Sequence, residues 1–246
     1  MNAAVERSPQ HYARICGVLY LLIIALGMFG EVAVRGAIVV AGDPAATAAN
    51  IAGNELLWRA GIAGDLLMQV LDVPTIVIFY LLLRPVSRSL ALMSTVFNIV
   101  QTSALALNKL ALIAPLLLLG QADLPGALPA AQWQGLSYLA IQAHGHGFGV
   151  GLIFFGFTCV IRGYLIVRST YLPKLLGVLL LLAGASYLVN SFALILAPDI
   201  AAALFPAILV PAFVGELCLA VWLLVKGVDL PRWQQRTAAV TRAGSP

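Results

Sequence analysis

The stretch from Leu56 to Leu83 reads LLWRAGIAGDLLMQVLDVPTIVIFYLLL and is apolar on every side of a helix. A helix needs about 20 mostly apolar residues to cross a bilayer, so this stretch can cross with tilt, a kink or an extension past the lipid. It contains two acids, Asp65 and Asp72, which are costly in lipid and must face protein or water. The stretch therefore predicts a membrane span with a polar, protein-facing stripe.

Five other apolar runs are long enough to cross a membrane, at about residues 15–33, 90–119, 136–161, 175–196 and 204–225. The chain of 246 residues is 61% hydrophobic and 10% charged, against about 45–50% and about 25% in soluble domains. The runs lack the alternation of membrane barrel strands. We predict an all-α polytopic membrane protein, a bundle of six transmembrane helices forming one domain over residues 1–236, with a short disordered tail over 237–246.

The basic residues predict the orientation of the spans. Eleven of the 14 lie before the first span or after the second, fourth and sixth, which predicts cytoplasmic N and C termini in a bacterial plasma membrane. This count places Arg162 in an inside loop and Arg35 at the outer end of a span. The charges are spread over four short segments, so the predicted partner is the lipid bilayer and no nucleic acid. We expect the first span to be retained rather than cleaved as a signal peptide.

Polar residues inside the spans are the candidates for function. In the second span Asp65, Gln69 and Asp72 stand at i, i+4 and i+7, which places them on one narrow face. Pro74 removes a helical hydrogen bond next to Asp72 and predicts a kink there. Two carboxylates beside a kink resemble the way in which membrane proteins form ion and proton sites.

The third span has a polar face that includes Gln101, Asn108 and Lys109. Lys109 is the natural partner for Asp65 or Asp72, because an unpaired ammonium in hydrocarbon is unfavourable. The alternative is that Lys109, near the outer end of its span, extends to the membrane surface.

The fourth and sixth spans add His144, His146 and Glu216. The two imidazoles point about 160 degrees apart on an ideal helix, so a shared metal ion is not expected, and we predict no metal and no cofactor. Gly147 and Gly151 predict a close helix contact, and such glycine-rich faces are also the predicted contact of a homo-oligomer, if one forms.

Several stretches of the second half carry a recognisable pattern, with matching positions in the first half: His144–Phe148, Gly151–Gly156, Gly163–Leu165, Tyr171–Pro173, Arg59, Asp65, Asp72 and Pro85. This pattern resembles the bacterial membrane family named domain of unknown function 4386 over nearly the whole chain. The resemblance implies the same topology and importance for Asp65, Asp72 and His144. Asn190 departs from the family, where an aspartate is frequent. The family has no established activity, so the resemblance names no reaction.

Three classes of function remain open from the sequence. The preferred one is binding or transport of a proton, a cation or a small polar molecule through a polar cavity that opens to the outer side. The alternatives are a structural or partner-binding membrane protein, and a membrane-embedded enzyme that uses His and Asp. The candidate binding residues are Asp65, Gln69, Asp72, Gln101, Asn108, Lys109, His144, His146 and Glu216.

Overall fold

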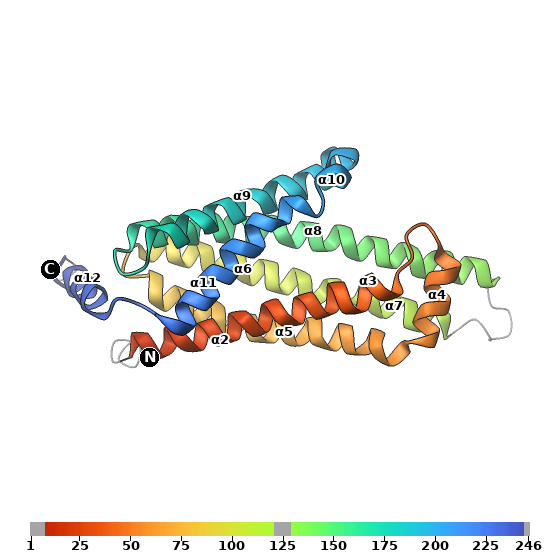
Figure 1. Cartoon of the computed structure of the whole chain (residues 1–246), viewed down its shortest axis with the longest axis horizontal. Coiled ribbons are helices and arrows are strands. Elements are labelled where there is room, and N and C mark those ends of the chain that lie inside the picture. The colour runs from red at the N-terminus through yellow and green to blue at the C-terminus, as the bar shows by residue number, and fades with distance from the viewer. Residues whose placement is uncertain (1–7, 121–128, 244–246) are drawn as a thin grey trace. The chain divides into compact units, whose positions relative to one another are not determined.

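The structure is a computed structural model that describes residues 8–120 and 129–243 (Figure 1). Helices and short connections make up these residues, and no strand occurs among them. The helical stretches that are long and apolar enough to cross a membrane are Pro9–Ile38, Glu55–Leu83, Arg88–Leu119, Ala130–Arg168, Lys174–Leu196 and Ala207–Val225. The predicted all-α fold with six spans is confirmed.

Some spans are single helices and others are interrupted. In chain order the elements are α2 (Pro9–Met28), the π-helical turn η1 (Phe29–Arg35), α3 (Gly36–Ile38), α4 (Pro44–Gly53), α5 (Glu55–Leu83), α6 (Arg88–Asn108), α7 (Leu110–Leu119), α8 (Ala130–Arg168), α9 (Lys174–Leu196), α10 (Pro198–Leu204), the 3-10 turn η2 (Ala207–Leu209), α11 (Val210–Val225) and α12 (Leu230–Ala243).

The chain divides into two compact units. Unit 1 consists of Met1–Leu22, Leu71–Thr102 and Gly149–Pro246, and unit 2 consists of Ile23–Val70 and Ser103–Phe148. Helices α2, α5, α6 and α8 contribute residues to both units. The single domain expected over residues 1–236 stays a prediction.

Glycines bring α8 and α9 into backbone contact within unit 1. A Cβ atom added to Gly163 would lie 2.7 Å from the carbonyl oxygen of Gly177, and one added to Gly184 would lie 2.7 Å from that of Gly156. The two glycines on each helix are seven residues apart, so they repeat on one face after two turns. Only residues without a side chain allow helix backbones to approach this closely in a membrane protein.

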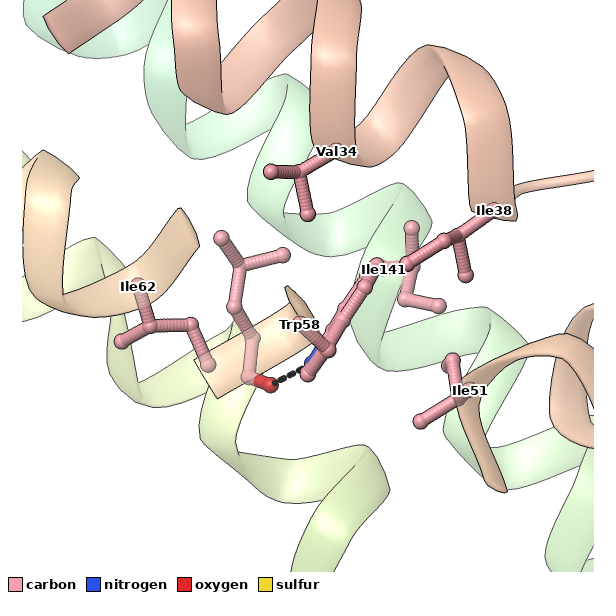
Figure 2. Packing of buried hydrophobic residues seen from close by; sticks show 7 residues of the cluster. Val34, Ile38, Ile51, Trp58, Ile62 and Ile141 are labelled. Carbon is pink, nitrogen blue, oxygen red and sulfur yellow. Dashed lines mark hydrogen bonds between the residues drawn. The ribbon is translucent and has the colours of Figure 1, made fainter. Parts of the chain in front are cut away.

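A cluster of buried apolar side chains forms the core of unit 2 (Figure 2). Trp58 lies at its centre with only 1% of its surface exposed, and its indole Nε1 donates a hydrogen bond of 2.9 Å to the carbonyl oxygen of Leu112. Val34, Ile51 and Ile141 pack around it from other elements. The cluster therefore ties four spans and α4 together within unit 2.

The connection after the first span leads into α4, whose first turn is capped. The side chain of Asp43 accepts a hydrogen bond of 2.9 Å from the backbone nitrogen of Ala46, and Pro44 occupies the first turn of α4. Asn50 in turn donates to the carbonyl oxygen of Ile38 at 3.0 Å, which fastens α4 to the end of the first span.

Two spans have boundaries that differ from the sequence predictions. Helix α8 extends past both ends of the predicted span at 136–161, because the residues on either side of that run continue its helix. The sixth span begins at Ala207, after Pro206, rather than at residue 204. Helix α12 runs from Leu230 to Ala243, and the disordered tail expected over 237–246 stays a prediction. Residues 121–128 lie outside the described part of the chain.

The glycine contact predicts the effect of one substitution. We expect Gly163→Leu to lower the midpoint of thermal unfolding of the purified protein in detergent, because the added side chain would meet the backbone of α9 at Gly177. Overpacking costs about 1–3 kcal/mol, and each kcal/mol shifts the midpoint by about 2–4 °C in a chain of this size.

Gly145→Leu is the matched control on the same helix. No atom lies within 4 Å of a Cβ added at Gly145, and leucine favours the helix over glycine, so the midpoint should stay unchanged or rise. Equal losses in the two variants would contradict the assigned contact.

Candidate functional site

The polar side chains within the spans form two groups, one in each unit. Seven of the nine sequence candidates are buried, whereas Asn108 is half-buried and His146 is exposed. Unit 2 contains Asp65, Gln69, Asn108, Lys109, His144 and His146, and unit 1 contains Asp72, Gln101 and Glu216. The stripe of α5 is buried along its length, but its two acids belong to different groups.

Asp65 is the centre of the group in unit 2. Its Oδ2 atom accepts a hydrogen bond of 2.7 Å from Nη1 of Arg35 and one of 2.9 Å from Nζ of Lys109. The carboxylate is 1% exposed, and its Oδ1 atom has no hydrogen-bond partner among the described residues. One buried carboxylate therefore balances two cations from other spans.

Lys109 connects this carboxylate to His144. The helix of the third span is interrupted at Lys109, between α6 and α7, and the side chain is only 1% exposed, so it does not extend to the surface. Its Nζ atom lies 3.1 Å from Nε2 of His144. An ammonium has only donors, so Nε2 of a neutral imidazole accepts this hydrogen bond. Asp65, Lys109 and His144 thus form a continuous chain of hydrogen bonds.

Asn108 and Gly147 hold the two helices at this distance. Nδ2 of Asn108 donates a hydrogen bond of 2.9 Å to the carbonyl oxygen of His144. A Cβ atom added to Gly147 would lie 2.7 Å from Cγ of Asn108. The close contact predicted at Gly147 is therefore with a side chain rather than with a helix backbone, and this glycine positions His144 next to Lys109.

Arg35 reaches Asp65 from the π-helical turn η1. Its Nε atom also donates to Glu31 at 2.8 Å, and the Glu31 side chain is 64% exposed. A Cβ atom on Gly30 would lie 3.2 Å from Cγ of Asp65, so this position leaves the space that the carboxylate fills. π-Helical turns are often found at functional sites, and here the turn carries both Arg35 and the glycine.

The group in unit 1 surrounds Asp72 with neutral donors. Asn98 donates to Oδ2 of Asp72 at 2.9 Å, and the hydroxyl of Thr102 donates to the same oxygen. Asn98 also contacts Oε1 of Gln101 at 2.7 Å and accepts a hydrogen bond from Arg162. Asp72 is therefore held by an amide and a hydroxyl, whereas Asp65 is held by cations.

Glu216 lies between two tyrosines in the same unit. Tyr20 donates a hydrogen bond of 2.9 Å to Oε2, and Tyr187 donates to Oε1. Arg162 stacks on the ring of Phe79 with 4.4 Å from Cζ to the ring centroid, and the same ring meets Tyr20 edge-on. The buried acids of unit 1 thus accept hydrogen bonds from uncharged groups around one buried guanidinium.

His146 is not brought into either group. It lies on the opposite side of α8 from His144, as its position two residues along the helix predicts, and its Nδ1 atom is 3.1 Å from the carbonyl oxygen of Gln142 on its own helix. Among the described residues, no three His, Cys, Asp or Glu side chains converge as a metal site would require. Gln69 is buried and its Nε2 atom has no partner within the described chain.

The sequence pattern does not identify Arg35 and Arg162 as site residues, because both resemble the basic residues that mark the ends of spans. Arg162 is 3% exposed inside α8, six residues before that helix ends. The apolar run resumes directly after it, from Gly163 to Val167, and this is the signal that the helix continues. For Arg35 the signal is Glu31, one helical turn earlier. Nothing in the sequence pairs Tyr20 with Glu216.

The charge balance around Asp65 predicts the effect of neutralising it. We expect Asp65→Asn to destabilise the protein by about 3–5 kcal/mol, because Arg35 and Lys109 would then be buried without a counter-charge. The midpoint of thermal unfolding in detergent measures this loss. Adding Lys109→Met to Asp65→Asn should recover part of it.

Glu31→Gln is the control, because it removes a carboxylate from the same cluster at an exposed position. An exposed ion pair contributes about 1 kcal/mol or less. If Asp65→Asn lowered the midpoint no more than Glu31→Gln does, the Asp65 carboxylate would not be the counter-charge of this group.

Comparisons with known proteins give a relative and a family, both without an assigned activity. An uncharacterized protein of Archaeoglobus fulgidus is 28% identical over 171 residues, which cover 69% of this chain and 85% of the relative. No solved structure matches the chain. The model of the family described as Domain of unknown function (DUF4386) matches residues 15–227. With most of its length matched, the chain belongs to this family of unknown function, and it is a multi-pass membrane protein by its six apolar helices.

Proposed function

We propose that the protein transports protons, and that Lys109 and His144 exchange the proton while Asp65 supplies the counter-charge. The observation that supports this proposal is the position of Lys109 Nζ, 2.9 Å from Asp65 Oδ2 and 3.1 Å from His144 Nε2. The sequence favours a proton, a cation or a small polar molecule as the ligand. A proton can move along this chain of hydrogen bonds without a cavity, whereas the other two ligands need a cavity large enough to hold them.

The burial of these groups supports the same proposal. A lysine, an aspartate and a histidine inside membrane spans are costly, and such residues commonly mark ion or proton pathways. All three are at least nine-tenths buried. A hydrogen bond between an ammonium and a neutral imidazole allows the proton to move from Nζ to Nε2, after which the lysine is neutral and His144 carries the charge.

The orientation of the protein in its membrane is also part of the proposal. The site is reached from the outer side of a bacterial plasma membrane, with both termini in the cytoplasm. The basic residues other than Arg162 support this orientation, because most of them stand at the ends of spans on one side.

A structural role is the second candidate. Its support is that Arg35, Lys109 and Asp65 are satisfied by one another, as side chains that join helices would be. This role requires the contacts but no movement of a proton, so a flux measurement separates the two functions.

His144→Gln tests proton transport with little change in shape. The amide can still accept the hydrogen bond from Lys109, but it cannot take the proton. The protein is reconstituted into vesicles that contain a pH-sensitive dye, and acidification of the lumen is followed after a membrane potential is imposed. We expect wild-type protein to speed acidification over protein-free vesicles, and His144→Gln to lower this rate by about 100-fold or more, the loss typical of a removed acid–base group.

His146→Gln is the matched control, because it is the same substitution two residues along the same helix, on an exposed side chain. It should leave the rate within about twofold of the wild type, well below the loss expected for an acid–base group. Wild-type vesicles that acidify no faster than protein-free ones would reject transport. Equal rates in the two glutamine variants would remove His144 from the pathway.

A further inference from the structure

A cleft lies in unit 1, at the ends of its spans. It has a volume of about 420 Å³. It is lined by residues 170–173 between α8 and α9, by residues 226–232, which run from the connection after α11 into the first turn of α12, and by Trp222. Pockets that hold small molecules typically have about 300–1,000 Å³. The cleft is far along the chain from Asp65, Lys109 and His144, and the proposed proton transport does not use it.

The charges of this cleft favour an anion. Lys226 is exposed, and its ammonium makes no ion pair or hydrogen bond within the described residues. Arg232 lines the same cleft and donates to the carbonyl oxygen of Thr170 at 3.3 Å. Asp229 is the one acid among the lining residues, and its oxygens are already engaged by the backbone nitrogen of Arg232 and by Nε of Arg232 at 3.4 Å. The cleft therefore has two basic side chains and one partly neutralised acid.

Its walls are apolar and well anchored. Leu172 and Val228 are buried, and the indole of Trp222 is held by a hydrogen bond of 3.1 Å to the carbonyl oxygen of Gly227. Tyr171 donates to the carbonyl oxygen of Leu82, and burial raises the pKa of its phenol, so it remains a donor that fixes this connection. The walls thus offer apolar contact next to the two basic side chains.

Helix α12 completes the basic side of the cleft. Trp233 is 3% exposed and packs the helix against the protein, and Arg236, one turn after Arg232, donates to the carbonyl oxygen of Pro85 at 3.3 Å. The described start of α12 is thus fixed to the ends of the spans, and Arg232 is held at the mouth of the cleft.

We propose that this cleft binds the headgroup of an anionic phospholipid, with Lys226 and Arg232 contacting the phosphate. A lipid fits better than a soluble phosphate because α9 begins at Lys174 and α11 ends at Val225, so acyl chains running beside these spans would start next to the cleft. A tryptophan near the end of a span, such as Trp222, is typical of the membrane interface. Basic side chains at the surface attract anionic lipids by charge.

Binding of short-chain lipids to the full chain in detergent tests the proposal. The probes are dioctanoyl phosphatidylglycerol, dioctanoyl phosphatidylcholine and glycerol phosphate, and native mass spectrometry counts the bound molecules. We expect phosphatidylglycerol to bind wild-type protein more tightly than the other two probes. Lys226→Gln and Arg232→Gln should each lower the affinity for phosphatidylglycerol about fivefold, and the double variant should lower it about 25-fold. These factors correspond to the usual binding energy of one basic side chain near a membrane surface.

Arg88→Gln is the matched control, because Arg88 is exposed in the same unit but does not line the cleft. It should change the affinity for phosphatidylglycerol less than twofold. This is a smaller change than the loss of a basic side chain that contacts the lipid headgroup would cause. The proposal is overturned if the two lipids bind the wild type equally, or if the double variant binds like Arg88→Gln. Glycerol phosphate binding as tightly as phosphatidylglycerol would assign the cleft to a soluble phosphate and would reject the lipid.

Discussion

A charge inside a bilayer needs a counter-charge or strong hydrogen bonds from the same chain, and the carboxylate of Asp65 meets this need for unit 2. It receives Arg35 from the first span and Lys109 from the third, and Lys109 continues to His144 in the fourth. The local features around it serve this contact: a π-helical turn presents Arg35, a helix break presents Lys109, and Gly30 leaves the space for the carboxylate.

Unit 1 meets the same need by other means. Asp72 and Glu216 accept hydrogen bonds from amide and hydroxyl groups, and the buried cation, Arg162, bonds to Asn98 rather than directly to either acid. Asp65 and Asp72 are seven residues apart on one face of α5, a rise of about 10 Å. Asp65 pairs with Arg35 and Lys109, whereas Asp72 pairs with Asn98 and Thr102, so one stripe serves two separate groups.

The six spans could be predicted because a bilayer demands length and apolarity, and both can be seen along the chain. Helical periodicity also gave the buried face of α5 and the opposite directions of His144 and His146. Partners on other helices could not be predicted, since periodicity says which face is buried but not which helix covers it. Arg162 shows that a charged residue need not mark the end of a span. Its burial depends on contacts with Asn98 and Phe79, which are more than 60 positions away in the sequence.

The backbone contact between α8 and α9 has a consequence for biogenesis. Glycines at 156, 163, 177 and 184 leave no side chain at the contact, so no acyl chain fits between the two helices there. Each helix alone would expose a strip of backbone to lipid. Residues 169–173 are the whole connection between them, so the partner emerges from the ribosome directly afterwards. The two spans therefore form a natural unit of insertion, a helical hairpin that enters the bilayer with both strips already covered.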